Sequence, residues 1–131
     1  MDCWISGLLD YWKNMAHRFK DLEIWRLSRR FCSDIYSITA SFPSEEKFGL
    51  TNQLRRASVS IPSNIAEGSS RKSNKDFSRF LEIAIGSIYE IETQLLIAKD
   101  LKFISDKQQE KLNKKLNSIL KMTVKFKSTL N

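Results

Sequence analysis

The chain has 131 residues, of which 41% are hydrophobic and 28% charged, a composition typical of one soluble globular domain rather than a disordered segment. Four glycines and two prolines are too few for a turn-rich β fold, and the apolar runs are too short to span a bilayer. The two cysteines, Cys3 and Cys32, provide no disulfide framework, so a reducing cytoplasm fits. A net charge of +7 favours polyanionic partners, although a solvated lysine face would give the same excess.

The first predicted helix covers about residues 20–40. Its apolar residues recur at three- and four-residue spacing and therefore share one face: Ile24, Leu27, Phe31, Ile35, Ile38 and Phe42. The helix should end before Pro43, because the residue before a proline resists helical geometry. Trp25, Cys32 and Tyr36 form a second apolar line about 100° around the helix. This line is either the edge of a wide core or an interface between subunits.

The second predicted helix begins at Ser44, a plausible cap, with Glu45 and Glu46 favourable at its positive end. Its inner face holds Leu50, Leu54, Ala57, Ile61 and Ile65. Because Pro62 lies within the span of this face, we predict a bent but continuous helix. Gly68 is expected to end the helix in a left-handed conformation.

Asn64 and Glu67 lie close to the predicted bend. They either satisfy backbone groups that Pro62 loosens, or belong to a polar patch that recognises a ligand or a neighbouring subunit. We favour the structural role for both. Glu67 is unfavourable at a helix C-terminus, so we expect it to pair with a cation such as Arg71.

The third predicted helix begins at Ser73, with Asp76 placed as in a capping box. Its apolar residues alternate steps of four and three, the period of a bundle: Phe77, Leu81, Ala84, Ile88, Ile91, Leu95 and Ala98. Gly86 costs about 1 kcal/mol relative to alanine inside a helix, so we expect it to allow close approach of a neighbouring helix.

Ser105 and Gln108 form a predicted capping box that opens the last helix. The inner face of this helix holds Leu112, Leu116, Ile119, Met122, Phe126 and Leu130. Short connections between four helices predict an all-α fold, an antiparallel up-down-up-down four-helix bundle whose second helix is kinked at Pro62.

Eleven basic residues on three of the helices and on one loop form the predicted nucleic-acid-binding surface. They are Arg29, Arg30, Arg55, Arg56, Arg71, Lys72, Lys75, Lys107, Lys114, Lys121 and Lys125. Contacts from these residues would go to phosphates, so binding should depend strongly on salt and only weakly on sequence.

Catalytic chemistry finds little support in the sequence. His17 is the single histidine and lies before the first predicted helix, so we do not expect a histidine-based triad or metal cluster; no glycine-rich phosphate-binding loop is present. Glu82 and Glu90 point away from the predicted core, and Glu92 could pair with an arginine of the second helix. We therefore expect no enzyme activity, no cofactor and no metal.

Five motifs follow one another through the first three helices. They are FKDLEIW at 19–25, QLRRA at 53–57, SIPSNIAEG at 60–68, FLEIAIGS at 80–87 and EIETQL at 90–95. Together they resemble the four-helix-bundle proteins encoded in intervening sequences of bacterial 23S rRNA genes. The resemblance implies an antiparallel bundle that assembles into a homopentamer, which favours the interface role for Trp25, Cys32 and Tyr36. A related branch, the accessory variability protein of diversity-generating retroelements, implies a basic surface that engages nucleic acid and a reverse transcriptase.

Residues 1–18 precede the part of the chain that carries this resemblance. Residues 1–14 lack the basic start and long apolar core of a signal peptide, and Met15-Ala16-His17 reads like a natural start. We predict an N-terminal extension over residues 1–18, with residues 1–14 a loosely ordered tail or a start-site artefact. The bundle domain should cover residues 19–131.

The sequence therefore predicts a non-enzymatic, cytoplasmic, homo-oligomeric bundle that binds RNA or DNA as an accessory factor. The alternative is a protein-interaction scaffold that docks a polymerase or a reverse transcriptase.

Overall fold

A computed structural model describes residues 19–131, so the predicted N-terminal extension, with Met15 and His17, lies outside the described residues. The described part of the chain is all-α. It consists of the α-helices α2 (Glu23–Thr39), α3 (Leu50–Ser69), α4 (Asn74–Asp100) and α5 (Asp106–Ser128), with the short 3₁₀ helix η1 (Ser44–Glu46) between the first two.

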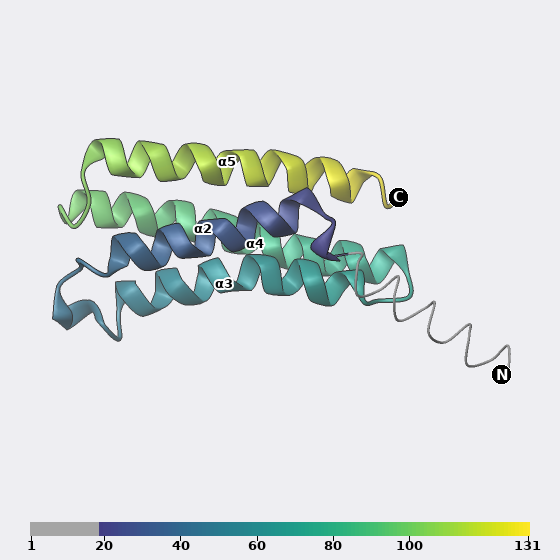
Figure 1. The fold of residues 1–131 in the computed structure, drawn as a ribbon, viewed down its shortest axis with the longest axis horizontal. Helices are drawn as coiled ribbons and strands as arrows, with labels where there is room; N and C mark the ends of the chain where they lie inside the picture. The colour runs from purple at the N-terminus through teal and green to yellow at the C-terminus, as the bar shows by residue number, and fades with distance from the viewer. Residues whose placement is uncertain (1–18) are drawn as a thin grey trace, which may run out of the picture.

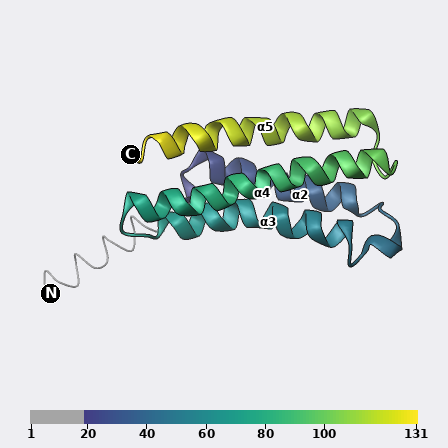
Figure 2. The same cartoon turned by 180° about the vertical axis from the view of Figure 1, so that it is seen from behind.

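The four helices lie side by side as an elongated bundle (Figure 1). The chain runs in alternate directions along successive helices, so α2 and α4 point one way and α3 and α5 the other, as the view from behind also shows (Figure 2). Each α-helix contacts two other α-helices, in the cyclic order α2, α3, α4, α5 and back to α2. The contact between α3 and α4 is the most extensive and that between α2 and α5 the least.

All four helices contribute to one hydrophobic core. The predicted inner face of α4 is buried along its whole length, at Phe77, Leu81, Ala84, Ile88, Ile91, Leu95 and Ala98. From the other helices the core receives Phe31, Ile35, Leu54, Ile61, Ile65, Leu116 and Ile119. None of the helices among the described residues combines the length and the apolar composition that crossing a membrane requires.

The start of α3 differs from the prediction. Ser44 opens η1 rather than α3, and its hydroxyl bonds Glu45 instead of capping the following helix. The long helix begins at Leu50, whose backbone N–H donates to the carboxylate of Glu46 at 2.9 Å. A glutamate therefore satisfies one of the free N–H groups at the N-terminus of α3, as its charge favours.

Pro62 lies inside one continuous helix, α3, while the predicted kink stays a prediction. A proline at this position leaves the carbonyl of Ser58 without its helical donor. We expected nearby polar residues of α3 to compensate, but Asn64 donates to the carbonyl of Ser60 instead, at 2.8 Å. The donor to Ser58 is the thiol of Cys32 on α2, with a sulfur–oxygen distance of 3.1 Å. The compensation thus comes from a neighbouring helix.

The predictions for two glycines were wrong. Gly68 does not end α3 in a left-handed conformation, because the helix continues to Ser69 and no described glycine has a positive φ. It is buried where a Cβ would lie 2.7 Å from Cβ of Phe80, so its missing side chain allows α3 and α4 to approach. Gly86, predicted to allow such an approach, has no atom within 4 Å of the corresponding position.

Two of the three predicted serine caps are confirmed, those at Ser73 and Ser105. The hydroxyl of Ser73 accepts from the backbone N–H of Asp76 at 3.1 Å and begins α4. At the start of α5, Ser105 and Gln108 form the reciprocal pair of hydrogen bonds that defines a capping box.

Candidate nucleic-acid interface

The exposed side of α2 carries a group of three arginines. Arg26, which was not among the predicted binding residues, joins the predicted Arg29 and Arg30 around a shallow hollow. Arg26 pairs with Glu23 at 3.0 Å, and the guanidinium of Arg29 lies 5.4 Å from the ring centre of Trp25. Within the described part of the chain, Arg30 takes part in no ion pair, so its charge is available to a partner.

Arg55 and Arg56 are neighbours in sequence but lie on different sides of α3. Arg55 turns toward α2, where it donates to the hydroxyl of Thr39 at 2.9 Å and lies 4.6 Å from the ring centre of Tyr36. Its guanidinium is largely used within the protein. Arg56 is exposed beside α4. The structure therefore separates these two predicted binding residues.

The loop between α3 and α4 exposes the predicted residues Arg71, Lys72 and Lys75. Arg71 pairs with Glu67 at 3.4 Å, which confirms the expected partner of this glutamate. Arg79, one turn into α4 beyond Lys75, is also exposed and was not singled out from the sequence. Four basic side chains therefore lie at this end of the bundle within a short stretch of chain.

The predicted lysines of α5 are all exposed but do not form one patch. Lys107 and Lys125 are 18 residues apart, about 27 Å along the helix axis. Two other lysines of α5 are paired with neighbouring helices, Lys115 with Asp34 at 3.0 Å and Lys127 with Glu82 at 3.4 Å. The lysine face of α5 thus extends along the whole bundle.

Positive charge is concentrated in one half of the bundle. Dividing each helix at its midpoint gives a loop half, which holds the α3–α4 loop, and a far half. The loop half comprises residues 19–31, 60–86 and 118–131, and the far half residues 32–59 and 87–117. Counted in the sequence, the loop half has 11 lysines and arginines against 5 acidic residues, whereas the far half has 9 against 8. The charge excess of the described residues therefore lies almost entirely in the loop half.

Two of the three predicted interface residues are half-buried and make contacts within the protein, and the third is exposed. Trp25 is half-buried and packs edge-on against Phe19, with ring centres 5.2 Å apart. Cys32 is half-buried and bonds Ser58, and burial raises the pKa of its thiol above the ordinary value of 9.0, against an opposing effect of that hydrogen bond. Tyr36 is 45% exposed, so it is the member of the set most accessible to a partner. A subunit interface at these residues stays a prediction.

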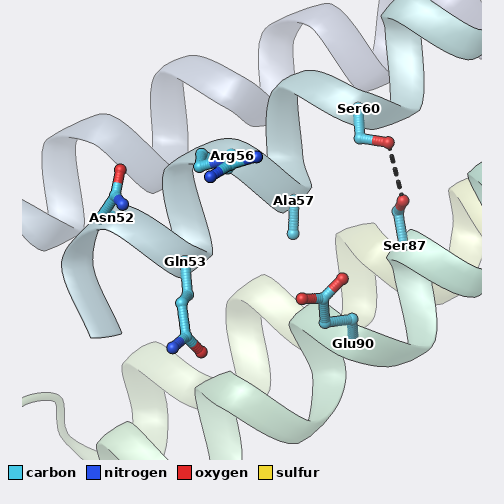
Figure 3. Close-up of a pocket in the computed structure, with 7 residues that line it drawn as sticks. All are labelled: Asn52, Gln53, Arg56, Ala57, Ser60, Ser87 and Glu90. Atoms are coloured by element: carbon cyan, nitrogen blue, oxygen red, sulfur yellow. Dashed lines mark hydrogen bonds between the residues drawn. The ribbon is translucent and has the colours of Figure 1, made fainter. Parts of the chain in front are cut away.

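A polar groove between α3 and α4 was not predicted. We call it the α3/α4 groove, and it has a volume of about 340 Å³. Its lining consists of Asn52, Gln53, Arg56, Ala57, Ser60, Ser87 and Glu90 (Figure 3). The hydroxyls of Ser60 and Ser87 lie 2.9 Å apart and join its two walls at one end. The sequence signal was a line of polar residues beside the apolar face of each helix.

The three glutamates of α4 differ in whether a neighbouring side chain engages them. Glu82 is paired with Lys127, Glu90 accepts from the amide of Gln94 at 3.2 Å, and Glu92 takes part in no ion pair among the described residues. The pairing of Glu92 with an arginine of α3 is therefore not found. Residues 19–131 also contain no group of three side chains that could hold a metal ion.

Comparison with known proteins identifies the family of this chain. A solved structure from Bacteroides thetaiotaomicron, a protein of unknown function from the S23 ribosomal protein family, is 25% identical and has a TM-score of 0.72. The match covers 79% of this chain and 97% of that one. No curated protein matches the chain. The family model of the 23S rRNA-intervening sequence protein matches residues 20–125, so the chain belongs to this family.

Proposed function

We propose that this protein is a non-enzymatic, cytoplasmic, homo-oligomeric bundle that binds RNA or DNA as an accessory factor. The observation that carries the proposal is the uneven charge of the bundle, 11 basic against 5 acidic residues in the loop half. Clustered exposed cations attract the phosphate backbone of any sequence. Nucleic acid is therefore expected to bind the loop half, with Arg71, Lys72, Lys75 and Arg79 at its centre.

A salt titration tests this function. The affinity for labelled RNA and DNA strands of unrelated sequence is measured by fluorescence anisotropy as the NaCl concentration rises. We expect binding at low salt that weakens steeply and similarly for all strands, because phosphates supply the contacts. Absence of binding at low salt would contradict the proposal.

Paired charge removals test the position of the interface. The double variant Lys72→Gln/Lys75→Gln removes two charges from the loop half, and Lys107→Gln/Lys114→Gln removes two from the far half. The loop variant should reduce the slope of log K against log[salt] by about 2, because each lost phosphate contact removes about 1. The far variant should change the slope much less. Equal changes in both variants would contradict binding by the loop half.

Assembly into a homo-oligomer, with five subunits as the expected number, is the second part of the proposal. It is supported by the hollow between α2 and α3, which holds Cys32 and the exposed apolar residues Tyr36 and Val59. Tyr36→Glu should lower the mass of the assembly measured by light scattering, whereas Tyr89→Glu on α4 is the matched control. Assembly would also multiply a weak nucleic-acid contact through avidity.

The alternative function is a scaffold that docks a polymerase or a reverse transcriptase. The exposed apolar residues of α4 favour it: Tyr89 is 55% exposed, Leu96 40% and Ile97 43%. A scaffold of this kind would not bind unrelated nucleic acid at low salt, so the salt titration separates the two functions. Pull-down of a purified reverse transcriptase, compared between the wild type and Tyr89→Glu, tests the alternative directly.

A further inference from the structure

The α3/α4 groove carries one positive and one negative side chain that do not form an ion pair with each other. Arg56 on α3 and Glu90 on α4 line the same groove, yet no ion pair links them among the described residues. Both side chains are exposed. A ligand that bears an anionic group and hydrogen-bond donors at separate places could therefore use both at once.

The carboxylate of Glu90 is held in place by a hydrogen bond from a buried glutamine. Gln94, which is only 5% exposed, donates its amide N–H groups to Glu90 at 3.2 Å and to Gln53 at 3.4 Å. In Figure 3, Glu90 projects from α4 toward α3, and Gln53 projects from α3 toward α4. Only one oxygen of the Glu90 carboxylate receives a hydrogen bond from a described residue. The carboxylate thus retains room for a pair of donors from a ligand.

A carboxylate that accepts two neighbouring donors distinguishes guanine from the other bases. The Watson–Crick edge of guanine presents N1–H and the N2 amino group side by side. Adenine and cytosine place one amino group beside an acceptor, and uracil places one N–H between two acceptors. Proteins recognise these edges in unpaired strands, where the bases are accessible.

Arg56 favours guanine over another group that presents two donors to a carboxylate, the arginine side chain of a partner protein. A guanidinium also offers two parallel donors to a carboxylate. In this groove, however, an incoming guanidinium would be repelled by Arg56, whose positive charge is not neutralised by an ion pair with a described residue. A guanine nucleotide instead brings a phosphate that Arg56 would attract.

The groove also lies on the path of a strand bound at the loop half. Arg79, Ile83, Ser87 and Glu90 are spaced by four, four and three residues, so they share one stripe of α4. From Arg79 to Glu90 the rise is about 16 Å. Arg79 and Ile83 line a neighbouring hollow at the start of this stripe. A strand could therefore contact the basic loop and the groove together.

We propose that the α3/α4 groove binds an unpaired guanine, with Glu90 accepting from N1–H and N2–H and Arg56 contacting a flanking phosphate. The inference rests on the proposed nucleic-acid binding and adds a base preference that phosphate contacts alone would not give.

The experiment compares three short RNA strands: oligouridylate, the same strand with one central guanosine, and the same strand with inosine at that place. Inosine lacks the N2 amino group and so loses one of the two donors. We expect the guanosine strand to bind about tenfold more tightly than oligouridylate, as a bidentate base contact allows. Inosine should lose most of this gain. Because these strands are compared on the wild-type protein, the test does not depend on the folding of a variant.

Two matched variants locate the effect. Glu90→Gln keeps the size of the side chain but offers only one acceptor, so the preference for guanosine should disappear. Glu92→Gln makes the same charge change on the opposite side of α4 and should keep it. Equal affinity for the three strands, or a preference that survives in Glu90→Gln, would overturn the guanine site alone. Failure of every strand to bind at low salt would overturn the proposed function with it.

Discussion

Replacing Gly68 with alanine tests how closely α3 and α4 approach in the loop half. A Cβ at this position would lie 2.7 Å from Cβ of Phe80 and 2.9 Å from a ring carbon of Phe77. The first of these atoms is fixed next to the backbone, so it can move only with α4 itself. The same substitution at Gly86 meets no atom within 4 Å and serves as the control.

The two substitutions should change stability in opposite directions. Alanine favours a helix over glycine by about 1 kcal/mol, a gain available at both positions. At Gly68 the added methyl group also overpacks the core, which costs about 1–3 kcal/mol. With contacts this short, the cost should lie in the upper part of that range and leave a net loss of about 1–2 kcal/mol. Gly86→Ala should gain about 0.5–1 kcal/mol.

Urea unfolding followed by circular dichroism, at one fixed protein concentration, measures both changes. In thermal unfolding followed by the same signal, the melting temperature should fall in Gly68→Ala and rise in Gly86→Ala, by about 4 °C for each kcal/mol in a domain of this size. If Gly68→Ala were as stable as Gly86→Ala, the close approach of α3 and α4 at this glycine would be wrong.

Three further predictions concern single contacts. Cys32→Ala should cost about 0.5–1 kcal/mol less in a Pro62→Ala background than in the wild type, because the substitution at 62 restores a backbone donor to Ser58; a double-mutant cycle measures this coupling, and additive effects would contradict it. Because the folded state raises the pKa of Cys32, its contribution to stability is complete below pH 9.0 and is lost as the pH rises through the folded pKa; Cys32→Ser should lack this alkaline loss in urea unfolding. Ser105→Ala should cost about 1 kcal/mol, whereas Ser44→Ala, which removes no α-helix cap, should stay within about 0.5 kcal/mol of the wild type.

Local patterns in the sequence predicted most of the fold. The helical period and the serine caps depend on residues three or four apart, so Ser73 and Ser105 were recognisable without a structure. The roles of Gly68 and Gly86 depend on the atoms of another helix, which no local pattern contains, and the predictions for both were wrong. The donor to the Ser58 carbonyl lies 26 residues away, on α2, for the same reason.

The sequence predicted which basic residues belong to the candidate site but not where on the bundle they gather. The basic residues were identified from the sequence, yet their grouping into a loop half and a far half requires the alternate directions of the helices. Arg55 and Arg56 illustrate the limit: adjacent positions on a helix point about 100° apart, so one faces α2 and the other the α3/α4 groove. The groove itself depends on residues of α3 and α4 that lie at the same level along the bundle axis, which the sequence does not specify.

The cyclic order of the helices has a consequence for how the chain folds. Three of the four contacts between α-helices join consecutive helices, so these contacts require closure of only short connecting loops. The contact of α2 with α5 is the exception, and its ion pair between Asp34 and Lys115 joins residues 81 positions apart. Such a topology has few long-range contacts, a property associated with rapid folding. Docking of α5 onto α2 would be the last step, because it has the largest loop-closure entropy and the least contact to offset it.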